Sequence, residues 1–149
     1  NRAEAYIRKY MKSGNEAEAR LALEDLNELR RHRLSAEYVD VAMDKFANAE
    51  ELLEFCLRER RRELCYEGNH RWFDLRRYAV NTVHPQAISV EHVWNTATQT
   101  EATVAGSYIL KGYDNTTKGS WMLPVPEDVI NYCYPVLSNF DRLSGVTKN

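Results

Sequence analysis

Three glutamates spaced four residues apart, Glu59, Glu63 and Glu67, are the side chains in this sequence that most resemble catalytic groups. On a helix this spacing puts the carboxylates along one side. Glycoside hydrolases instead use two carboxylates that face each other across the substrate, usually from different elements. Each glutamate also has arginines close by in the chain, which keep a carboxylate ionised, whereas a general acid needs a raised pKa. We therefore expect no enzyme activity.

The sequence lacks other patterns of catalytic or metal-binding residues. No Ser-His-Asp arrangement, phosphate-binding loop or metal-ligand spacing stands out. Cys56 and Cys65 lie on one predicted helix, about 13 Å apart, which is too far for a disulfide. We interpret the cysteines as buried thiols that act as small hydrophobic residues. We expect no metal and no cofactor.

Residues 59–78 combine a high density of charge with several aromatic side chains. A nucleic-acid surface is one interpretation, but the acidic residues between the arginines and the net charge of −2 argue against it. The helical phase places Arg60 on an apolar face, where a guanidinium needs a carboxylate partner. We therefore predict a structural charge network at a corner between two helices. Its predicted members are Arg60, Glu63, Glu67, Arg71 and Asp74.

The elements that carry these residues follow from periodicity and capping signals. Residues 1–12 have helical spacing of apolar side chains, and Gly14 is able to end that helix. Asn15, with Glu18 three positions later, predicts a capping box at the start of a second helix. Residues 1–33 therefore predict an antiparallel helical hairpin that resembles a tetratricopeptide unit.

The charged corner is predicted to span residues 49–79. Asn48 and Glu51 again form a capping pair, and the helix that follows is predicted to run to Glu67 and to close at Gly68. A second, short helix is predicted over residues 70–78. On the first of these helices Leu53, Cys56, Leu57 and Leu64 share the face that includes Arg60.

Beyond residue 79 charge falls, and Thr, Ser, Asn and Val become frequent. Residues 88–94 alternate like a strand, and residues 108–110 predict another. Residues 120–126 are predicted to be extended, Pro126 to start a short helix, and the last ten residues to form a loop. The predicted fold class is mainly α, with a tetratricopeptide-like helical hairpin, further helices, and an irregular C-terminal region containing a few short strands. No run of 18 apolar residues exists to span a membrane.

Several motifs together resemble the C-terminal portion of the SusD/RagB family of outer-membrane nutrient-binding lipoproteins. The run E-R-R-R-E-L occupies residues 59–64, E-G follows at 67–68, and R-W-F-D-L-R-R at 71–77. A later L-P-V-P-E occupies residues 123–127. The chain departs from the family pattern by one extra residue at Asn69-His70 and by a loosely matching segment near its end.

The resemblance implies that residues 1–149 are the C-terminal portion of a single SusD-like domain. Its parts would be the hairpin (1–33), the charged helical corner (49–79) and an irregular, loop- and short-strand-rich region (80–149). Because the chain opens in helical rhythm, we expect it to be a piece of a longer protein. The resemblance also implies an outward-facing position on the cell outer membrane, with attachment through an N-terminal lipid absent from this chain.

The function that the resemblance implies is non-catalytic capture of an oligosaccharide or other nutrient and its delivery to a SusC-like TonB-dependent transporter. Aromatic rings that stack on sugars, flanked by polar groups, would suit this function. The candidate ligand-binding residues are Trp94, Asn95, Tyr113, Asp114, Asn115 and Trp121. Packing within the core or a strand is the alternative for each aromatic residue. The alternative function is a helical-repeat adaptor module that binds a protein or peptide partner.

Overall fold

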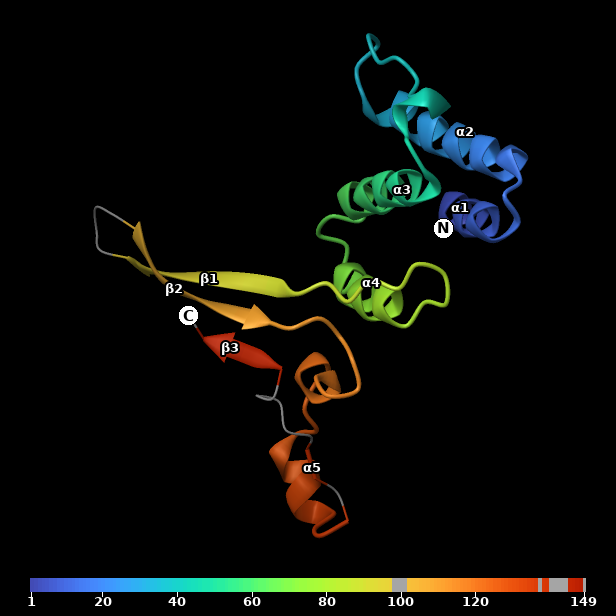
Figure 1. The fold of residues 1–149 in the computed structure, drawn as a ribbon. Coiled ribbons are helices and arrows are strands. Elements are labelled where there is room, and N and C mark those ends of the chain that lie inside the picture. The colour runs from blue at the N-terminus through green and yellow to red at the C-terminus, as the bar shows by residue number, and fades with distance from the viewer. Residues whose placement is uncertain (98–101, 137, 140–144, 149) are drawn as a thin grey trace. The chain divides into compact units, whose positions relative to one another are not determined.

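Two antiparallel helices begin the chain in the computed structural model, α1 (Arg2–Ser13) and α2 (Glu16–Arg33) (Figure 1). Gly14 ends α1 with φ 68° and donates its backbone N–H to the carbonyl of Tyr10. The side chain of Asn15 accepts the backbone N–H of Ala17, so the predicted cap is confirmed. The capping box is not formed, because the carboxylate of Glu18 binds the ammonium of Lys9 at 2.5 Å.

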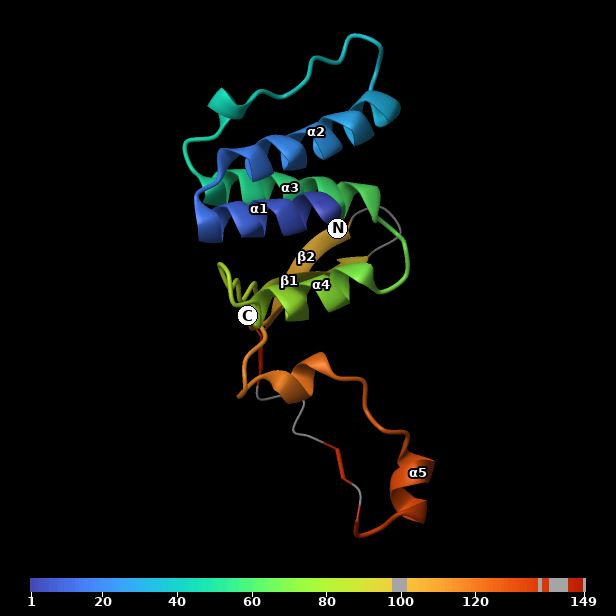
Figure 2. The ribbon, with the colours of Figure 1, turned by 90° about the vertical axis from the view of Figure 1, so that its right-hand side faces the viewer.

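The structure describes residues 1–97, 102–136, 138–139 and 145–148, without the side chains of residues 95–97, 102 and 103. The chain divides into two compact units, Asn1–Arg71 and Trp72–Asn149. In the first unit α1, α2 and α3 (Ala49–Glu63) run side by side (Figure 2). Small and branched apolar side chains fill the space between them. The buried set includes Ala3, Ile7, Ala19, Ala22, Leu23, Leu26, Leu52, Leu53 and Leu57.

The helix α3 begins as predicted and ends earlier than predicted. Asn48 accepts the backbone N–H of Glu51 at 2.9 Å, and Glu51 in turn accepts the N–H of Ala47 at 2.8 Å. The helix ends at Glu63 instead of Glu67. Residues 65–67 are all exposed, so no burial stabilises another helical turn. Tyr66 already has a φ of 65°, two residues before Gly68.

The predicted position of Arg60 inside the apolar face of α3 is wrong. The buried face of α3 consists of Leu52, Leu53, Cys56, Leu57 and Glu59. Burial of Leu52, which the sequence pattern left out, centres this face one residue earlier than predicted. Glu59 is therefore the buried charged residue, at 7% exposure, whereas Arg60 is half-buried and binds Asn1. Cys56 is buried as expected, but Cys65 is exposed.

The helix α4 (His70–Ala79) confirms the second predicted helix of the charged corner and crosses from the first unit into the second. The second unit contains a three-stranded antiparallel sheet in the order β1 (Val90–Ala97), β2 (Ala102–Leu110) and β3 (Val146–Lys148). The register shifts between Trp94 and Asn95. The strands β1 and β2 overlap the two predicted strand segments, residues 88–94 and 108–110, whereas β3 lies in the segment predicted as loop.

Trp121 is the centre of the described core of the second unit and is fully buried. It lies in a short 3₁₀ helix (Lys118–Trp121), where an extended segment was predicted. Its Nε1 donates to the carbonyl of Lys111 at 2.8 Å, and its ring lies 4.5 Å from that of Trp72. The last helix, α5 (Glu127–Tyr132), follows Pro126 as predicted. The described residues thus form a mainly helical fold of five α-helices with a small sheet, which confirms the predicted fold class.

Candidate functional site

An ion-pair cluster around the buried carboxylate of Glu59, which we call the Glu59 cluster, consists of Glu59, Arg30 and Arg62 in the first unit. Glu59 Oε1 lies 2.8 Å from Arg30 Nη1 and also binds Arg62. The guanidinium of Arg30 lies over the rings of Tyr38 and Phe55, at 5.0 and 5.4 Å from their centroids. Burial lowers the pKa of Arg30, but hydrogen bonds to Tyr38 and Glu59 outweigh this and leave its pKa raised. Each charge in this cluster therefore has a partner.

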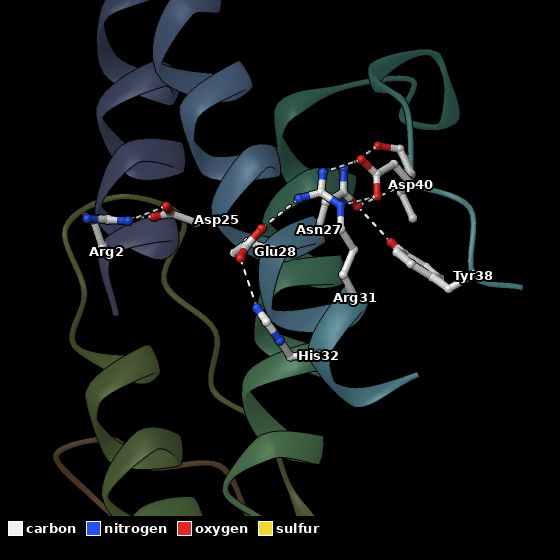
Figure 3. Close-up of polar contacts among 9 residues, drawn as sticks. Arg2, Asp25, Asn27, Glu28, Arg31, His32, Tyr38 and Asp40 are labelled. Carbon is white, nitrogen blue, oxygen red and sulfur yellow. Dashed lines mark hydrogen bonds and ion pairs between the residues drawn. The ribbon is translucent and has the colours of Figure 1, made fainter. Parts of the chain in front are cut away.

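The connection over residues 34–48 is attached to α2 through Asn27 and Arg31 (Figure 3). Asn27 donates to the carbonyl of Val41 at 2.9 Å and accepts from its N–H at 3.0 Å. Tyr38 Oη donates to Asn27 Oδ1 at 2.8 Å. Arg31 binds Asp40 on the connection, and its hydrogen bond is the largest cause of the lowered pKa of Asp40. These carboxylates and amides attach one segment to another.

A second carboxylate on α2, Glu28, also has a lowered pKa. The largest cause is the hydrogen bond with His32, at 3.0 Å, followed by the one from Arg31 at 2.7 Å. Lowered pKa values of Glu28 and Asp40 are the opposite of what a general acid requires. The polar groups drawn in Figure 3 therefore have the character of structural contacts.

A cavity of about 570 Å³ lies beside the Glu59 cluster. Two glutamates of the predicted charge network, Glu63 and Glu67, line this cavity. Arg33 on α2 binds Glu63, so all three arginines that line the cavity are in ion pairs. The lining residues are Leu29, Arg30, Arg33, Leu34, Glu59, Arg62, Glu63 and Glu67. Because its cations are neutralised by carboxylates, this cavity is poorly suited to an anionic ligand.

The other members of the predicted charge network lie near different partners. Arg60 donates to the side chain of Asn1, and the Arg33–Glu63 pair joins α2 to α3. Asp74, on α4 in the second unit, is buried and pairs with Arg77 at 3.0 Å. Arg71 is half-buried. The sequence prediction missed Arg30 and Glu59 because their pairing depends on how α2 and α3 pack together.

A smaller pocket of about 300 Å³ in the second unit is lined by Phe73, Arg76, Arg77, Val80 and Tyr113. We call it the Tyr113 pocket. Phe73, Arg76 and Arg77 lie on one face of α4, because Arg76 and Arg77 follow Phe73 by three and four positions, and Val80 directly follows the helix. Phe73 is 58% exposed although it is a large aromatic residue. The guanidinium of Arg76 lies 5.5 Å from the centroid of the Tyr113 ring.

Tyr113 is held in place by a ring contact with Trp121 and by the close packing of the preceding residue, Gly112. Its ring meets Trp121 edge-on, with centroids 6.4 Å apart. The preceding residue, Gly112, packs so closely on the backbone of Ala87 that an added Cβ would lie 2.5 Å from its carbonyl group. The segments before β1 and after β2 are thereby held together. A rigid aromatic side chain on such a support is suited to stacking against a ligand.

Asp114 stabilises the loop that follows Tyr113. Its Oδ1 accepts from the Thr116 hydroxyl at 2.7 Å and from the backbone N–H groups of Thr116 and Thr117, at 2.6 and 2.9 Å. The hydrogen bond from the Thr116 hydroxyl is the largest cause of the lowered pKa of Asp114, and the two backbone N–H groups add to it. Asn115, between them, is exposed. Of the predicted ligand residues, Tyr113, Asp114 and Asn115 thus occupy one loop.

The remaining predicted ligand residues lie elsewhere in the second unit. Trp94, on β1, is half-buried and packs near Tyr108 and Lys148, and its Nε1 finds no acceptor among the described residues. The side chain of Asn95 is outside the described residues. Trp121 is fully buried, so its ring supports Tyr113 and is closed to a ligand. Phe73 and Arg76 were not predicted, although their spacing on α4 was a signal that could have found them.

Comparison with known families decides the relationship that the motifs suggest. The sequence model of the SusD family matches residues 1–139, which is nearly the whole chain. The chain belongs to the SusD family. No curated protein and no solved structure matches the chain. The family match includes the Glu59 cluster, all of α4 and the Tyr113 pocket.

Membership of the SusD family has direct functional consequences. SusD proteins are non-catalytic binding proteins, and their family role is glycan binding linked to transport by SusC. They are surface lipoproteins of the outer membrane. Within the described part of this SusD protein, no helix has the length and apolar character needed to cross a bilayer. Its described His, Cys, Asp and Glu residues form no group of three or more able to hold a metal ion.

Proposed function

We propose that this SusD-family protein captures an oligosaccharide at the outer-membrane surface and delivers it to a SusC-like TonB-dependent transporter. The observation that carries the proposal is the family match over residues 1–139. No covalent step is part of the function. In this proposal the protein faces outward and is attached to the membrane by an N-terminal lipid.

We propose the Tyr113 pocket as a site of glycan contact. Its two aromatic side chains, Phe73 and Tyr113, supply apolar surface for the C–H face of a sugar ring. Exposed Asn115 and the free lone pairs of Asp114 are close to Tyr113 in the chain and suit hydrogen bonds to sugar hydroxyls. Trp121 contributes by supporting Tyr113. The Glu59 cluster, by contrast, has no part in the proposed glycan contact.

Trp94 and Asn95 belong to a separate part of the proposal. They follow one another on β1, at the point where the strand register shifts. Such irregularities re-aim side chains and are common beside binding sites. We include them as a second, weaker contact with a longer glycan. Loss of Trp94 is expected to affect long oligosaccharides more than short ones, as measured by calorimetry with oligomers of different lengths.

The direct test is glycan binding by the protein and by its Tyr113→Ala variant. A glycan array identifies a ligand, and titration calorimetry then measures its Kd. Removal of the aromatic ring is expected to weaken binding roughly tenfold, because a stacked aromatic ring contributes on the order of 1 kcal/mol or more. Tyr132→Ala is the matched control, since Tyr132 is 92% exposed on α5 and outside the pocket. Equal affinities for the protein and Tyr113→Ala would remove the pocket from the proposal.

The transport part of the proposal has its own test. Affinity purification from outer membranes of the native bacterium is expected to recover a SusC-like transporter with this protein. The gene for such a transporter is expected next to the gene for this protein. Recovery of a cytoplasmic protein in place of a transporter would instead favour an adaptor built on the α1–α2 hairpin.

A further inference from the structure

Arg76 differs from the other arginines around the proposed glycan site in its electrostatic partners. Among the described residues it makes no ion pair with a carboxylate, and its recorded contact is with the face of Tyr113. Its neighbour Arg77 pairs with Asp74 at 3.0 Å and also lies over the ring of Tyr78. The first unit shows the contrast, because Arg30, Arg33 and Arg62 are all paired there.

The Tyr113 pocket therefore carries an excess of positive charge. Of the residues that the structure describes, two arginines line it and no carboxylate does. Arg77 is paired with the buried carboxylate of Asp74, whereas Arg76 pairs with no carboxylate among the described residues. Asp114, the next residue after Tyr113, does not line the pocket, and its Oδ1 accepts hydrogen bonds from Thr116 and Thr117. An anionic group on a ligand would complete the charge balance of Arg76.

The chemistry of Arg76 also favours a planar or tetrahedral oxyanion. A guanidinium presents a rigid fork of N–H donors that binds a carboxylate or sulfate through two parallel hydrogen bonds. The guanidinium carbon of Arg76 lies over the Tyr113 ring, 5.5 Å from its centroid, and no hydrogen bond to another described residue occupies its N–H donors. Partial burial strengthens such a contact relative to one in open solvent.

We propose that the Tyr113 pocket binds the anionic group of an acidic sugar unit, with Arg76 as the residue that selects it. This inference rests on the proposed glycan-binding function and specifies its ligand class. The oxyanion, a carboxylate of a uronic acid or a sulfate ester, binds the guanidinium of Arg76. The sugar ring lies against Phe73 and Tyr113. The volume of about 300 Å³ is at the lower end for ligand pockets and suits a single sugar unit.

Calorimetric titration with three oligosaccharides of equal length tests this proposal. The probes are an oligogalacturonate, a sulfated galactan oligosaccharide and a neutral galactan oligosaccharide. We expect at least one acidic probe to bind more tightly than the neutral one, and its Kd to rise with NaCl concentration because the contact is ionic. Preference for the uronate identifies a carboxylate ligand, and preference for the sulfated probe identifies a sulfate ester. Either result supports the proposal.

Variants of Arg76 test whether this residue causes the preference for acidic over neutral oligosaccharides. Arg76→Gln is expected to weaken binding of the preferred acidic probe roughly tenfold or more, since a hydrogen bond to a charged group is lost, and to leave neutral binding unchanged. Arg76→Lys keeps the positive charge without the forked N–H donors, and its affinity for the acidic probe is expected to fall less than that of Arg76→Gln. If Arg76→Gln melts at a lower temperature, Arg76→Lys is used in its place to test the role of this residue. Arg61→Gln is the matched control, because Arg61 is an exposed arginine outside the pocket.

The outcomes separate this inference from the proposed function. Equal binding of acidic and neutral probes, unaffected by Arg76→Gln, overturns the selectivity and leaves glycan capture standing. Equal losses for acidic probes in Arg76→Gln and Arg61→Gln also overturn it, because general charge would then explain the effect. Failure of this protein to bind any glycan on an array overturns both proposals.

Discussion

At the scale of single residues, a buried carboxylate is the most consequential side chain in the first unit. Glu59 is 7% exposed and contacts two guanidinium groups, one of which is also in contact with two aromatic rings. A buried ion pair is costly to break, because removal of one partner leaves the other charge without compensation. Arg60, one position later, is half-buried and lies near the N-terminal residue. Neighbouring residues in a charged run can thus differ greatly in energetic importance.

We therefore expect Glu59→Gln to lower the free energy of unfolding by about 3 kcal/mol, since Arg30 then loses its buried anionic partner. Urea denaturation followed by circular dichroism measures the difference. Glu54→Gln, an exposed glutamate on the same helix, is the control and is expected to change stability by less than about 0.5 kcal/mol. Arg60→Ala is expected to cost less than about 1 kcal/mol, because Arg60 is only half-buried and polar contacts near the surface contribute little. A larger loss for Arg60→Ala than for Glu59→Gln would contradict the assignment of the buried charge.

At the scale of elements, the connection over residues 34–48 shows how a segment with little regular structure is held in place. It contains one short 3₁₀ helix, Met43–Lys45, and no buried side chain. Polar contacts with α2 compensate for the lack of buried apolar surface. Asn27 binds both backbone groups of Val41, and Arg31 binds Asp40 (Figure 3). Attachment of the connection should therefore depend on pH.

The sign of that dependence follows from the lowered pKa of Asp40. A carboxyl group whose pKa is lower in the folded protein stabilises the fold above its unfolded pKa, near 4, and this contribution disappears as pH falls through the folded pKa. We expect stability to decline below about pH 4, and the decline to be shallower in Asp40→Asn. The measurement is the urea midpoint at several pH values between neutral and about pH 3. Asp44→Asn, which changes an exposed aspartate on the same connection, is the control and should show the same pH dependence as the unmodified protein. If stability declines with pH in Asp40→Asn as steeply as in the unmodified protein, the Arg31–Asp40 pair does not have this role.

At the scale of the whole molecule, features that depend on adjacent residues were predicted better from the sequence than features that depend on residues far apart in the chain. The caps at Asn15 and Asn48, the left-handed Gly14 and the start of α5 at Pro126 depend on a few adjacent residues, and all were predicted correctly. The burial of Glu59 depends on α2, and that of Trp121 depends on Trp72 and Lys111. The strand β3 forms only because β2, far earlier in the chain, offers it an edge. Periodicity alone contains none of this information.

The aromatic ligand residues illustrate the same limit. Tyr113, Trp94 and Trp121 look alike in the sequence, since each is an aromatic residue with a polar residue directly beside it. Packing separates them, because Trp121 is fully buried while Tyr113 lines a pocket. The face of α4 that completes this pocket also includes Phe73 and Arg76, from the most recognisable family motif. A motif that identifies the family thus also contributes side chains to the proposed glycan site.

The structure separates the residues that stabilise the protein from those proposed to bind its ligand. The Glu59 cluster lies in Asn1–Arg71, and the Tyr113 pocket lies in Trp72–Asn149. Mutations that share no partners usually have independent effects. We therefore expect Glu59→Gln to lower the melting temperature while its folded fraction binds the glycan with unchanged Kd. Tyr113→Ala is expected to weaken binding with a much smaller loss of thermal stability. Calorimetric titration well below each melting temperature measures the affinity, and thermal melts measure the stability. A fall of both affinity and stability in Glu59→Gln would show that the Glu59 cluster contributes to ligand capture.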